Sequence, residues 1–331
     1  MSERFDTGKF VISLDFELFW GVRDKRTVGN YGENILGVKE VIPSLLHLFD
    51  KYGIKGTFST VGFLFATDKS ELIRFSPELR PAYTDYNLSP YASFDKVGND
   101  ETGDPYHFGF SLLQQIKENG NHEIGTHTFC HYYCLEPGQT VQAFKEDLLA
   151  AKSIAADKGI TVKSLVFPRN QFNAEYLSVC KETGIESYRG NPSSWLYAGR
   201  NKNEESIFRR VLRFADAYVN LTGHHCHSAD VVNSSPLLNV AASRFLRPYS
   251  RPVSFLDGLR LRRIKKAMRH AAKYNKLFHL WWHPHNFGKD LQQNMDFLDR
   301  ILQYYAELHK QYRFESITMS GLADKLKMQH E

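Results

Sequence analysis

The stretch KFVISLDF, residues 9–16, decides how the chain begins to fold. It is a short apolar run rich in β-branched residues, which is typical of a buried strand. Residues 34–53 then carry apolar side chains at helical spacing and end at Gly53, a residue suited to a helix C-cap. A second strand-like run, residues 54–65, leads into a glycine turn. This order of strand, helix and strand predicts a parallel α/β sheet or barrel.

The alternation of helices and short strands continues along the chain. Helical periodicity recurs in four later segments, residues 111–121, 140–159, 257–275 and 290–312. Two stretches, residues 67–110 and 191–257, lack this regularity, and long irregular stretches are usually insertions that often shape a binding cleft. No linker divides the sequence. We therefore predict one domain, residues 1–331, with insertions near 67–110 and 191–257.

The composition excludes several kinds of protein. The 331 residues include 42% hydrophobic residues and carry a net charge of +5, so the chain can bury a sizeable core and is only mildly basic. The basic cluster at residues 259–270 is typical of a solvated helix face, so we expect no nucleic acid partner. We find neither a secretory signal nor an integral membrane segment. Four cysteines without a disulfide pattern indicate reduced thiols and a cytoplasmic protein, and nothing indicates its oligomeric state.

Polar residues recur where predicted strands end. Alternation along an extended chain places Asp15 and Glu17 on one side. His127, Arg169 and His283 each follow another strand-like run. Open sheets and barrels of the α/β class build their sites at the carboxyl ends of parallel strands. These residues are therefore candidates for one site.

The segment NHEIGTHTFCHYYC, residues 121–134, contains His127 and His131 four positions apart. On a helix or a tight helical turn this spacing puts both imidazoles on one side. Two imidazoles and a carboxylate suit zinc or a related divalent ion, which can lower the pKa of water and polarise a carbonyl. A second carboxylate could then take a proton and another histidine could protonate a departing amine. Cys130 and Cys134 leave a structural zinc site as an alternative, although the usual C-x2-C spacing is missing.

The order SLDFE, GTFSTVG, HEIGTHTFCH, VFPRN and LWWHPH resembles the polysaccharide deacetylases of the NodB-homology type, also called carbohydrate esterase family 4. The resemblance extends from about residue 10 to about residue 290. It implies a distorted (β/α) barrel with about seven strands and long loop insertions. It also implies a metal-dependent hydrolase acting on carbon–nitrogen bonds other than peptide bonds, with zinc as the expected cofactor.

The resemblance also implies roles for individual residues. It gives catalytic roles to Asp15 as general base, His283 as general acid and Arg169 as the residue that holds Asp15. It gives metal ligation to Glu17, His127 and His131.

The sequence departs from the family pattern at three places. Pro168 precedes Arg169, whereas family members usually have arginine before proline in this motif. The acid expected to tune His283 has no clear match in IESYRG, and Asp216 is the substitute we consider. Glu17 stands where an aspartate is usual and has a longer reach.

Four residues are predicted to contact substrate. Arg23, in the basic run RDKR, could meet phosphates, and a backbone N–H near Asn170 could stabilise an oxyanion. Trp282 could stack on a sugar face. His285, close to His283, is the fourth.

Together these features predict an enzyme that removes an N-acetyl group from an amino sugar. The substrate would be nucleotide-linked, lipid-linked or a polysaccharide precursor, such as one for O-antigen or capsule. One alternative is an allantoinase-like hydrolase of small cyclic amides or ureides, and another is a non-catalytic carbohydrate-binding protein. The run HHCHS, residues 224–228, is either a second metal site or a loop whose histidines are incidental or touch substrate.

Overall fold

Strand β1, Lys9–Phe16, is the centre of the fold. The computed structural model describes residues 5–199, 206–233 and 237–328. Every residue of β1 is buried, and the strand pairs in parallel with β2 (Gly56–Thr60) and β8 (Leu277–Trp282). A strand covered on both faces and paired along both edges is mostly apolar, and the buried polar residues of KFVISLDF, Lys9, Ser13 and Asp15, need partners.

The named strands form one parallel sheet. Its order is β6-β5-β4-β3-β2-β1-β8-β7, and β9 pairs with the start of β1. The remaining strands are β3 (Glu123–Thr126), β4 (Ser164–Leu165), β5 (Ser187–Tyr188), β6 (Leu238–Asn239), β7 (Arg244–Phe245) and β9 (Glu315–Ser316). Because the pairing is parallel, the carboxyl ends of β1, β3 and β8 lie at the same end of the sheet.

One short segment, residues 238–246, closes the sheet into a barrel. Its first part pairs with β5, since the N–H groups of Val240 and Ala242 donate to the carbonyls of Tyr188 and Gly190. Its second part pairs with β8, since the N–H groups of Ser243 and Leu246 donate to the carbonyls of His279 and Trp281. The barrel strands are thus β1 to β5, this segment and β8. The predicted distorted (β/α) barrel of about seven strands is confirmed.

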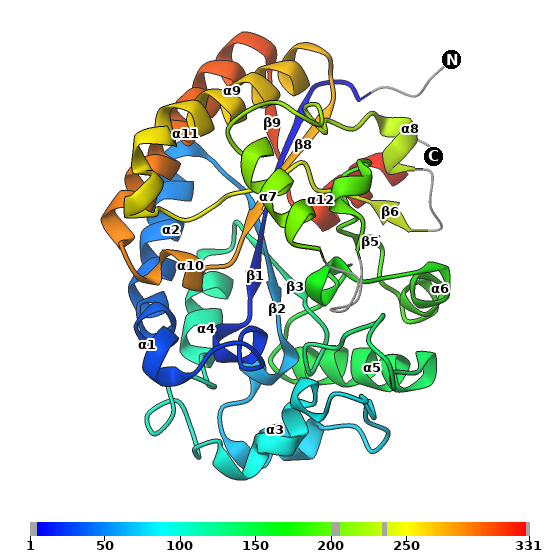
Figure 1. Cartoon of the computed structure of the whole chain (residues 1–331). Coiled ribbons are helices and arrows are strands. Elements are labelled where there is room, and N and C mark those ends of the chain that lie inside the picture. The colour runs from blue at the N-terminus through cyan, green and yellow to red at the C-terminus, as the bar shows by residue number, and fades with distance from the viewer. Residues whose placement is uncertain (1–4, 200–205, 234–236, 329–331) are drawn as a thin grey trace.

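Helices surround the barrel. In Figure 1, α1, α2, α9 and α11 lie on one side of β1 and β2, and α5, α6 and α12 lie on the other. The longer helices are α1 (Val28–Leu36), α2 (Val38–Tyr52), α4 (Phe110–Asn119), α5 (Val141–Asp157), α6 (Ala174–Glu182), α9 (Asp257–Lys273), α11 (Leu291–Tyr312) and α12 (Met319–Lys327). None of the helices in the described residues combines the length and apolarity needed to cross a bilayer.

Some boundaries differ from the sequence prediction. The helix predicted over residues 34–53 is two helices that meet at Gly37, where a Cβ atom would lie 2.3 Å from the carbonyl oxygen of Gly288. Packing against that backbone requires the glycine. The stretch 67–110 is partly helical, with α3 (Lys69–Phe75) and two 3-10 turns, Tyr86–Leu88 and Pro90–Lys96.

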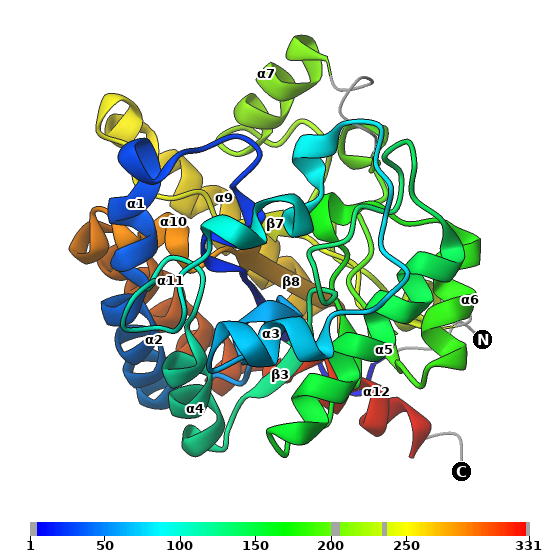
Figure 2. The same ribbon diagram turned by 90° about the horizontal axis from the view of Figure 1, so that it is seen from below.

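The stretch 191–257 is more than an insertion, because it contains β6 and β7, which complete the barrel. It also contains α7 (Ile207–Asp216) and α8 (Ala229–Val232). Figure 2 shows α7 standing out at the rim, away from the ring of helices around the strands.

Candidate metal and catalytic site

Polar side chains from β1, β3 and β8 meet at the carboxyl end of the barrel. They line a pocket of about 330 Å³. Its walls include Asp15, Glu17, His127, His131, His283 and His285. Residues that are more than 260 positions apart in the sequence thus come together, as the positions at strand ends predict.

Glu17, His127 and His131 form a compact group. The Oε2 atom of Glu17 lies 3.4 Å from Nε2 of His127 and 3.1 Å from Nε2 of His131. Atoms bound to one tetrahedral zinc ion at about 2.0–2.1 Å are about 3.3 Å apart. The three side chains therefore have the spacing of ligands to a single ion, and each is buried.

The two imidazoles present the correct nitrogen atoms. Nδ1 of His127 lies 2.8 Å from the carbonyl oxygen of Val166, which can only accept, so this nitrogen carries a proton and Nε2 is the nitrogen that faces Glu17. Nδ1 of His131 lies 3.1 Å from the hydroxyl of Tyr133. Burial lowers the pKa of His131 to about 4, so its imidazole is neutral at pH 7. This set of donors fits zinc.

The turn that carries the two histidines is not helical. Thr128 and His131 have φ values of 63° and 61°, so the chain bends sharply twice. Asp147 on α5 holds the turn, since its carboxylate accepts hydrogen bonds from the N–H groups of Phe129 (2.7 Å) and Cys130 (3.0 Å). The histidines therefore share one side because of this anchored turn and not because of a helical repeat.

Glu17 depends on a glycine. A Cβ atom on Gly21 would lie 1.9 Å from Cδ of Glu17, so the carboxylate fills the space that a side chain at position 21 would take. Burial alone would raise the pKa of Glu17, but the imidazoles of His283, His127 and His131 outweigh it and hold the pKa well below its usual value. The longer glutamate side chain is thus accommodated and remains ionised.

Arg189 holds Asp15, which corrects the role predicted for Arg169. The guanidinium of Arg189 donates to both oxygens of Asp15, at 2.6 and 2.8 Å. Burial would raise the pKa of Asp15, but the charge of Arg189 overcomes it and the pKa is lowered. Arg169 instead pairs with Asp24 and Glu136, and its guanidinium lies over the ring of Tyr133.

A chain of hydrogen bonds inside the barrel orients Arg189. Nδ1 of His279 must donate to the carbonyl oxygen of Val240 at 2.8 Å, so its Nε2 accepts from the hydroxyl of Ser13 at 2.8 Å. The Ser13 oxygen in turn accepts from Arg189 at 3.0 Å. Sequence reasoning missed Arg189, Ser13 and His279, although Ser13 shares the inward side of β1 with Asp15 and His279 shares that of β8 with His283.

His283 faces the open side of the pocket. Its side chain is 24% exposed, and its Nε2 lies 3.7 Å from Oδ2 of Asp15 and 3.6 Å from Oε1 of Glu17. His285 stacks beneath it and is only 3% exposed, with Nε2 3.8 Å from the same oxygen of Glu17. The other nitrogen of His283 faces the amide oxygen of Asn286 at 3.3 Å. Asp216, the substitute considered for tuning His283, instead pairs with Arg244.

The predicted substrate contacts lie in different places. Asn170 lines the pocket, but its N–H donates to the carbonyl of Phe167 at 2.9 Å, so this N–H is already engaged. Arg23 does not line this pocket, whereas Lys25, two positions later, does. Trp282 is fully buried and packs against Phe287, which makes its predicted contact with a sugar wrong.

Trp281, two positions before His283, is the tryptophan that lines the pocket, and Arg189 lies 4.0 Å above its ring. The rule of alternation along β8 could have found it.

The other candidate metal sites do not form in the described residues, where Glu17, His127 and His131 are the one group with metal-binding geometry. Cys130 and Cys134 are buried and free. In the HHCHS run, Nε2 of His225 lies 2.7 Å from the hydroxyl of Thr222, and Nε2 of His227 lies 3.2 Å from the carbonyl of Ala242. The interpretation of this run as a loop is thus better supported than a second metal site.

Comparison with known proteins bears on the family and the fold. The polysaccharide deacetylase family model matches residues 29–188, which include His127 and His131 but not Asp15, Glu17 or His283. No curated protein sequence matches this chain significantly.

Solved structures with a similar fold include two that align with nearly the whole of this chain. A Mycobacterium smegmatis protein assigned as a polysaccharide deacetylase has a TM-score of 0.61 and 13% identity, covering 100% of this chain and 96% of that one. PuuE allantoinase has a TM-score of 0.52 and 11% identity, covering 96% and 89%. At such identities these two structures bear on the fold alone.

The match to the polysaccharide deacetylase family model supports a hydrolase of carbon–nitrogen bonds other than peptide bonds, as predicted. Over residues 29–188 the chain matches the polysaccharide deacetylase family, so the family that its motifs resemble is confirmed there.

Replacing Gly21 by alanine should displace the carboxylate of Glu17, because the new methyl group would overlap it. We expect Gly21→Ala to lose most of its bound divalent ion, measured by elemental analysis of the purified protein. Gly258→Ala is the matched control, since nothing lies within 4 Å of a Cβ atom there. A full complement of metal in Gly21→Ala would contradict the position of Glu17.

Replacing Arg189 by methionine leaves the carboxylate of Asp15 buried without its partner. We expect Arg189→Met to lower the free energy of unfolding by about 3–5 kcal/mol, measured by urea denaturation. In the Asp15→Asn background the same replacement should cost less, because no buried carboxylate is left without a partner. An equal cost of Arg189→Met in both backgrounds would show that the two residues are not coupled.

The ion pair of Asp15 and Arg189 predicts how the stability of the protein depends on pH. Because the folded-state pKa of Asp15 is lowered, its contribution to stability is present above about pH 4 and is lost as the pH falls through the folded value. Arg189→Met removes the group that lowers this pKa. The loss of stability between pH 7 and pH 3 should therefore be smaller in the variant than in the wild type.

Proposed function

We propose that this protein is a zinc-dependent deacetylase that removes the N-acetyl group of an amino sugar. The observation that carries the proposal is the convergence of Glu17, His127 and His131 with Asp15 and His283 beside them. This combination provides three ligands, a carboxylate outside the ligand set and an imidazole open to the pocket.

Glu17 and the Nε2 atoms of His127 and His131 would hold the ion. When bound, zinc lowers the pKa of water and polarises a carbonyl oxygen. Three protein ligands leave a coordination position for a small molecule, as catalytic zinc sites do. The neutral imidazole of His131 supports this role, because a protonated ring could not ligate.

Asp15 is the general base of the proposed reaction. It is ionised, and Arg189 fixes both of its oxygens, so the carboxylate cannot turn away from the pocket. His283 is the general acid. Its partly exposed ring lies between the carboxylates and the open side of the pocket, where the nitrogen of the leaving amine would be.

The family supports an acetylated carbohydrate as substrate. Within that class we propose a precursor of a surface glycan, such as O-antigen or capsule, carried on a nucleotide or a lipid. Such a precursor is assembled before export, so the reaction would take place on the cytoplasmic side.

Loss of one ligand tests the metal site. His127→Ala should lose the bound ion and with it the release of amine from N-acetylated amino sugars. His47→Ala, an exposed histidine on α2, is the control and should keep both. An unchanged metal content in His127→Ala would count heavily against the site.

Replacement of His283 tests its role in proton transfer. His283→Asn should retain the ion but lower kcat by about 10²–10⁴-fold, because no ligand is removed and only the proton donor is lost. Amine release should be followed on N-acetylated sugars and, in parallel, on cyclic imides and ureides. Turnover of the cyclic compounds alone would favour an allantoinase-like reaction, and sugar binding without any turnover would indicate a carbohydrate-binding protein.

A further inference from the structure

A second and larger cavity adjoins the proposed catalytic pocket. Its volume is about 650 Å³, and it lies between α7 and the residues around β7. The two cavities share part of their walls, including Asn170, Phe245, Trp281 and His283. A substrate bound at the catalytic pocket can therefore extend into this cavity, which we call the arginine cleft.

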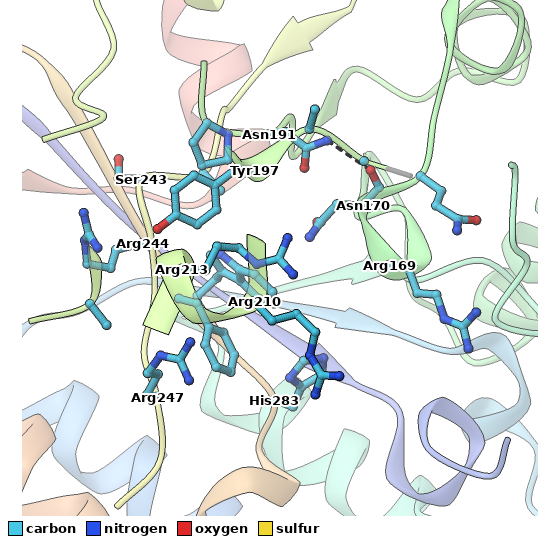
Figure 3. Close-up of a pocket in the computed structure, with 18 of the residues that line it drawn as sticks. Arg169, Asn170, Asn191, Tyr197, Arg210, Arg213, Ser243, Arg244, Arg247 and His283 are labelled. Atoms are coloured by element: carbon cyan, nitrogen blue, oxygen red, sulfur yellow. Dashed lines mark hydrogen bonds between the residues drawn. The ribbon is translucent and has the colours of Figure 1, made fainter. Parts of the chain in front are cut away.

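The arginine cleft is lined by cations. Its walls carry Lys25, Arg169, Arg210, Arg213, Arg244 and Arg247, and among the described residues that line it none is acidic. Figure 3 shows Arg210, Arg213 and Arg247 reaching into the same space. Excess positive charge in a concave site attracts and concentrates anions.

Nearby carboxylates neutralise only some of these cations. Arg169 pairs with Asp24 and Glu136, and Arg244 pairs with Asp216 at 3.1 Å. For Arg210 and Arg247, no carboxylate lies at ion-pair distance within residues 5–199, 206–233 and 237–328.

Asp216 does not also neutralise the charge of Arg247. It is fully buried, and its oxygens already accept from the hydroxyl of Tyr197 at 2.7 Å and from the N–H groups of Leu221 and Thr222. Arg244 and Arg263 share its charge, the latter at 3.7 Å.

Arg247 is partly buried and makes a cation–π contact. Its guanidinium lies 5.2 Å from the ring centre of Phe214. Burial, together with repulsion from Arg213 and Arg244, lowers its pKa. A partly buried guanidinium facing like charges would be stabilised by a bound anion.

We infer that the arginine cleft binds a phosphate group of the substrate while the N-acyl group occupies the catalytic pocket. This inference rests on the proposed deacetylase function and specifies its substrate class, a phosphate-linked amino sugar. Several guanidinium groups on different elements suit phosphate, whose free oxygens can each accept from a different guanidinium group. Tyr197, Asn191 and Ser243 add neutral polar groups to the same wall.

Binding of glucose 1-phosphate tests the cleft without catalysis, because this sugar has no amide to hydrolyse. Calorimetry should detect glucose 1-phosphate but not glucose, and Arg247→Gln should weaken the binding about 10- to 100-fold. Arg300→Gln, an exposed arginine on α11, is the matched control and should bind like the wild type.

The His127→Ala background separates the cleft from the metal. Phosphate that bound only to the ion would be lost there, whereas binding by the arginines should persist. Equal binding of glucose and glucose 1-phosphate, or loss of binding in His127→Ala alone, would overturn the inference. Because this measurement needs no turnover, it can succeed or fail separately from the deacetylase proposal.

Steady-state kinetics then test whether a phosphate on the substrate improves turnover. The N-acetylated amino sugar should be turned over with a kcat/KM at least tenfold higher when it carries a phosphodiester, and Arg247→Gln should reduce that ratio. Preference for a sugar carboxylate over the phosphodiester would overturn the phosphate assignment.

The phosphodiester is tested with a nucleotide and with a dodecyl group, as models of the two carriers. Ile207 and Phe208 of α7 are 77% and 66% exposed beside Arg210, so we expect the lipid-like substrate to be better. A better nucleotide substrate would support the phosphate site and overturn this preference.

Discussion

The structure depends on the compensation of two carboxylates buried at the end of one strand. Asp15 and Glu17 are each 3% exposed, and an uncompensated buried charge costs several kcal/mol. Arg189 compensates Asp15, and the imidazoles around Glu17 offer a cation site. These partners follow β5, β3 and β8, so only a closed barrel brings them to the end of β1.

The sequence predicts the outline of this site because one rule, polar residues at the ends of parallel strands, applies to most of its members. The rule does not separate two arginines that both follow strands. Arg189 continues the extended chain of β5 and points inward. Arg169 lies in a turn with a φ of 54°, which directs its side chain to Asp24 and Glu136. The backbone conformation determines which arginine reaches Asp15, and the pattern of residues in the sequence does not reveal that conformation.

Other differences have equally local causes. Trp281 and Trp282 are adjacent in one apolar run. Only the alternation of side chains along the strand, which puts Trp281 on the same side as His283, tells which tryptophan faces the pocket. The segment that closes the barrel has strands of two residues, too short to give a period, so it could only be read as part of an insertion. Long periodic helices such as α5 and α11 were predicted to within a few residues, because packing on one face imposes a pattern of many residues.

The two adjoining cavities share Lys25 and Arg169 but differ in their other charged residues, and this difference gives the site a direction. The acidic residues that line them, Asp15 and Glu17, belong to the smaller pocket, whereas Arg210 and Arg247 belong only to the larger one. A substrate with an uncharged acyl amide at one end and an anion at the other can satisfy both cavities in one orientation, since the reverse would place its anion beside the carboxylates. His283 lies in the wall common to both, where the bond between the acyl group and the sugar nitrogen would lie in that orientation.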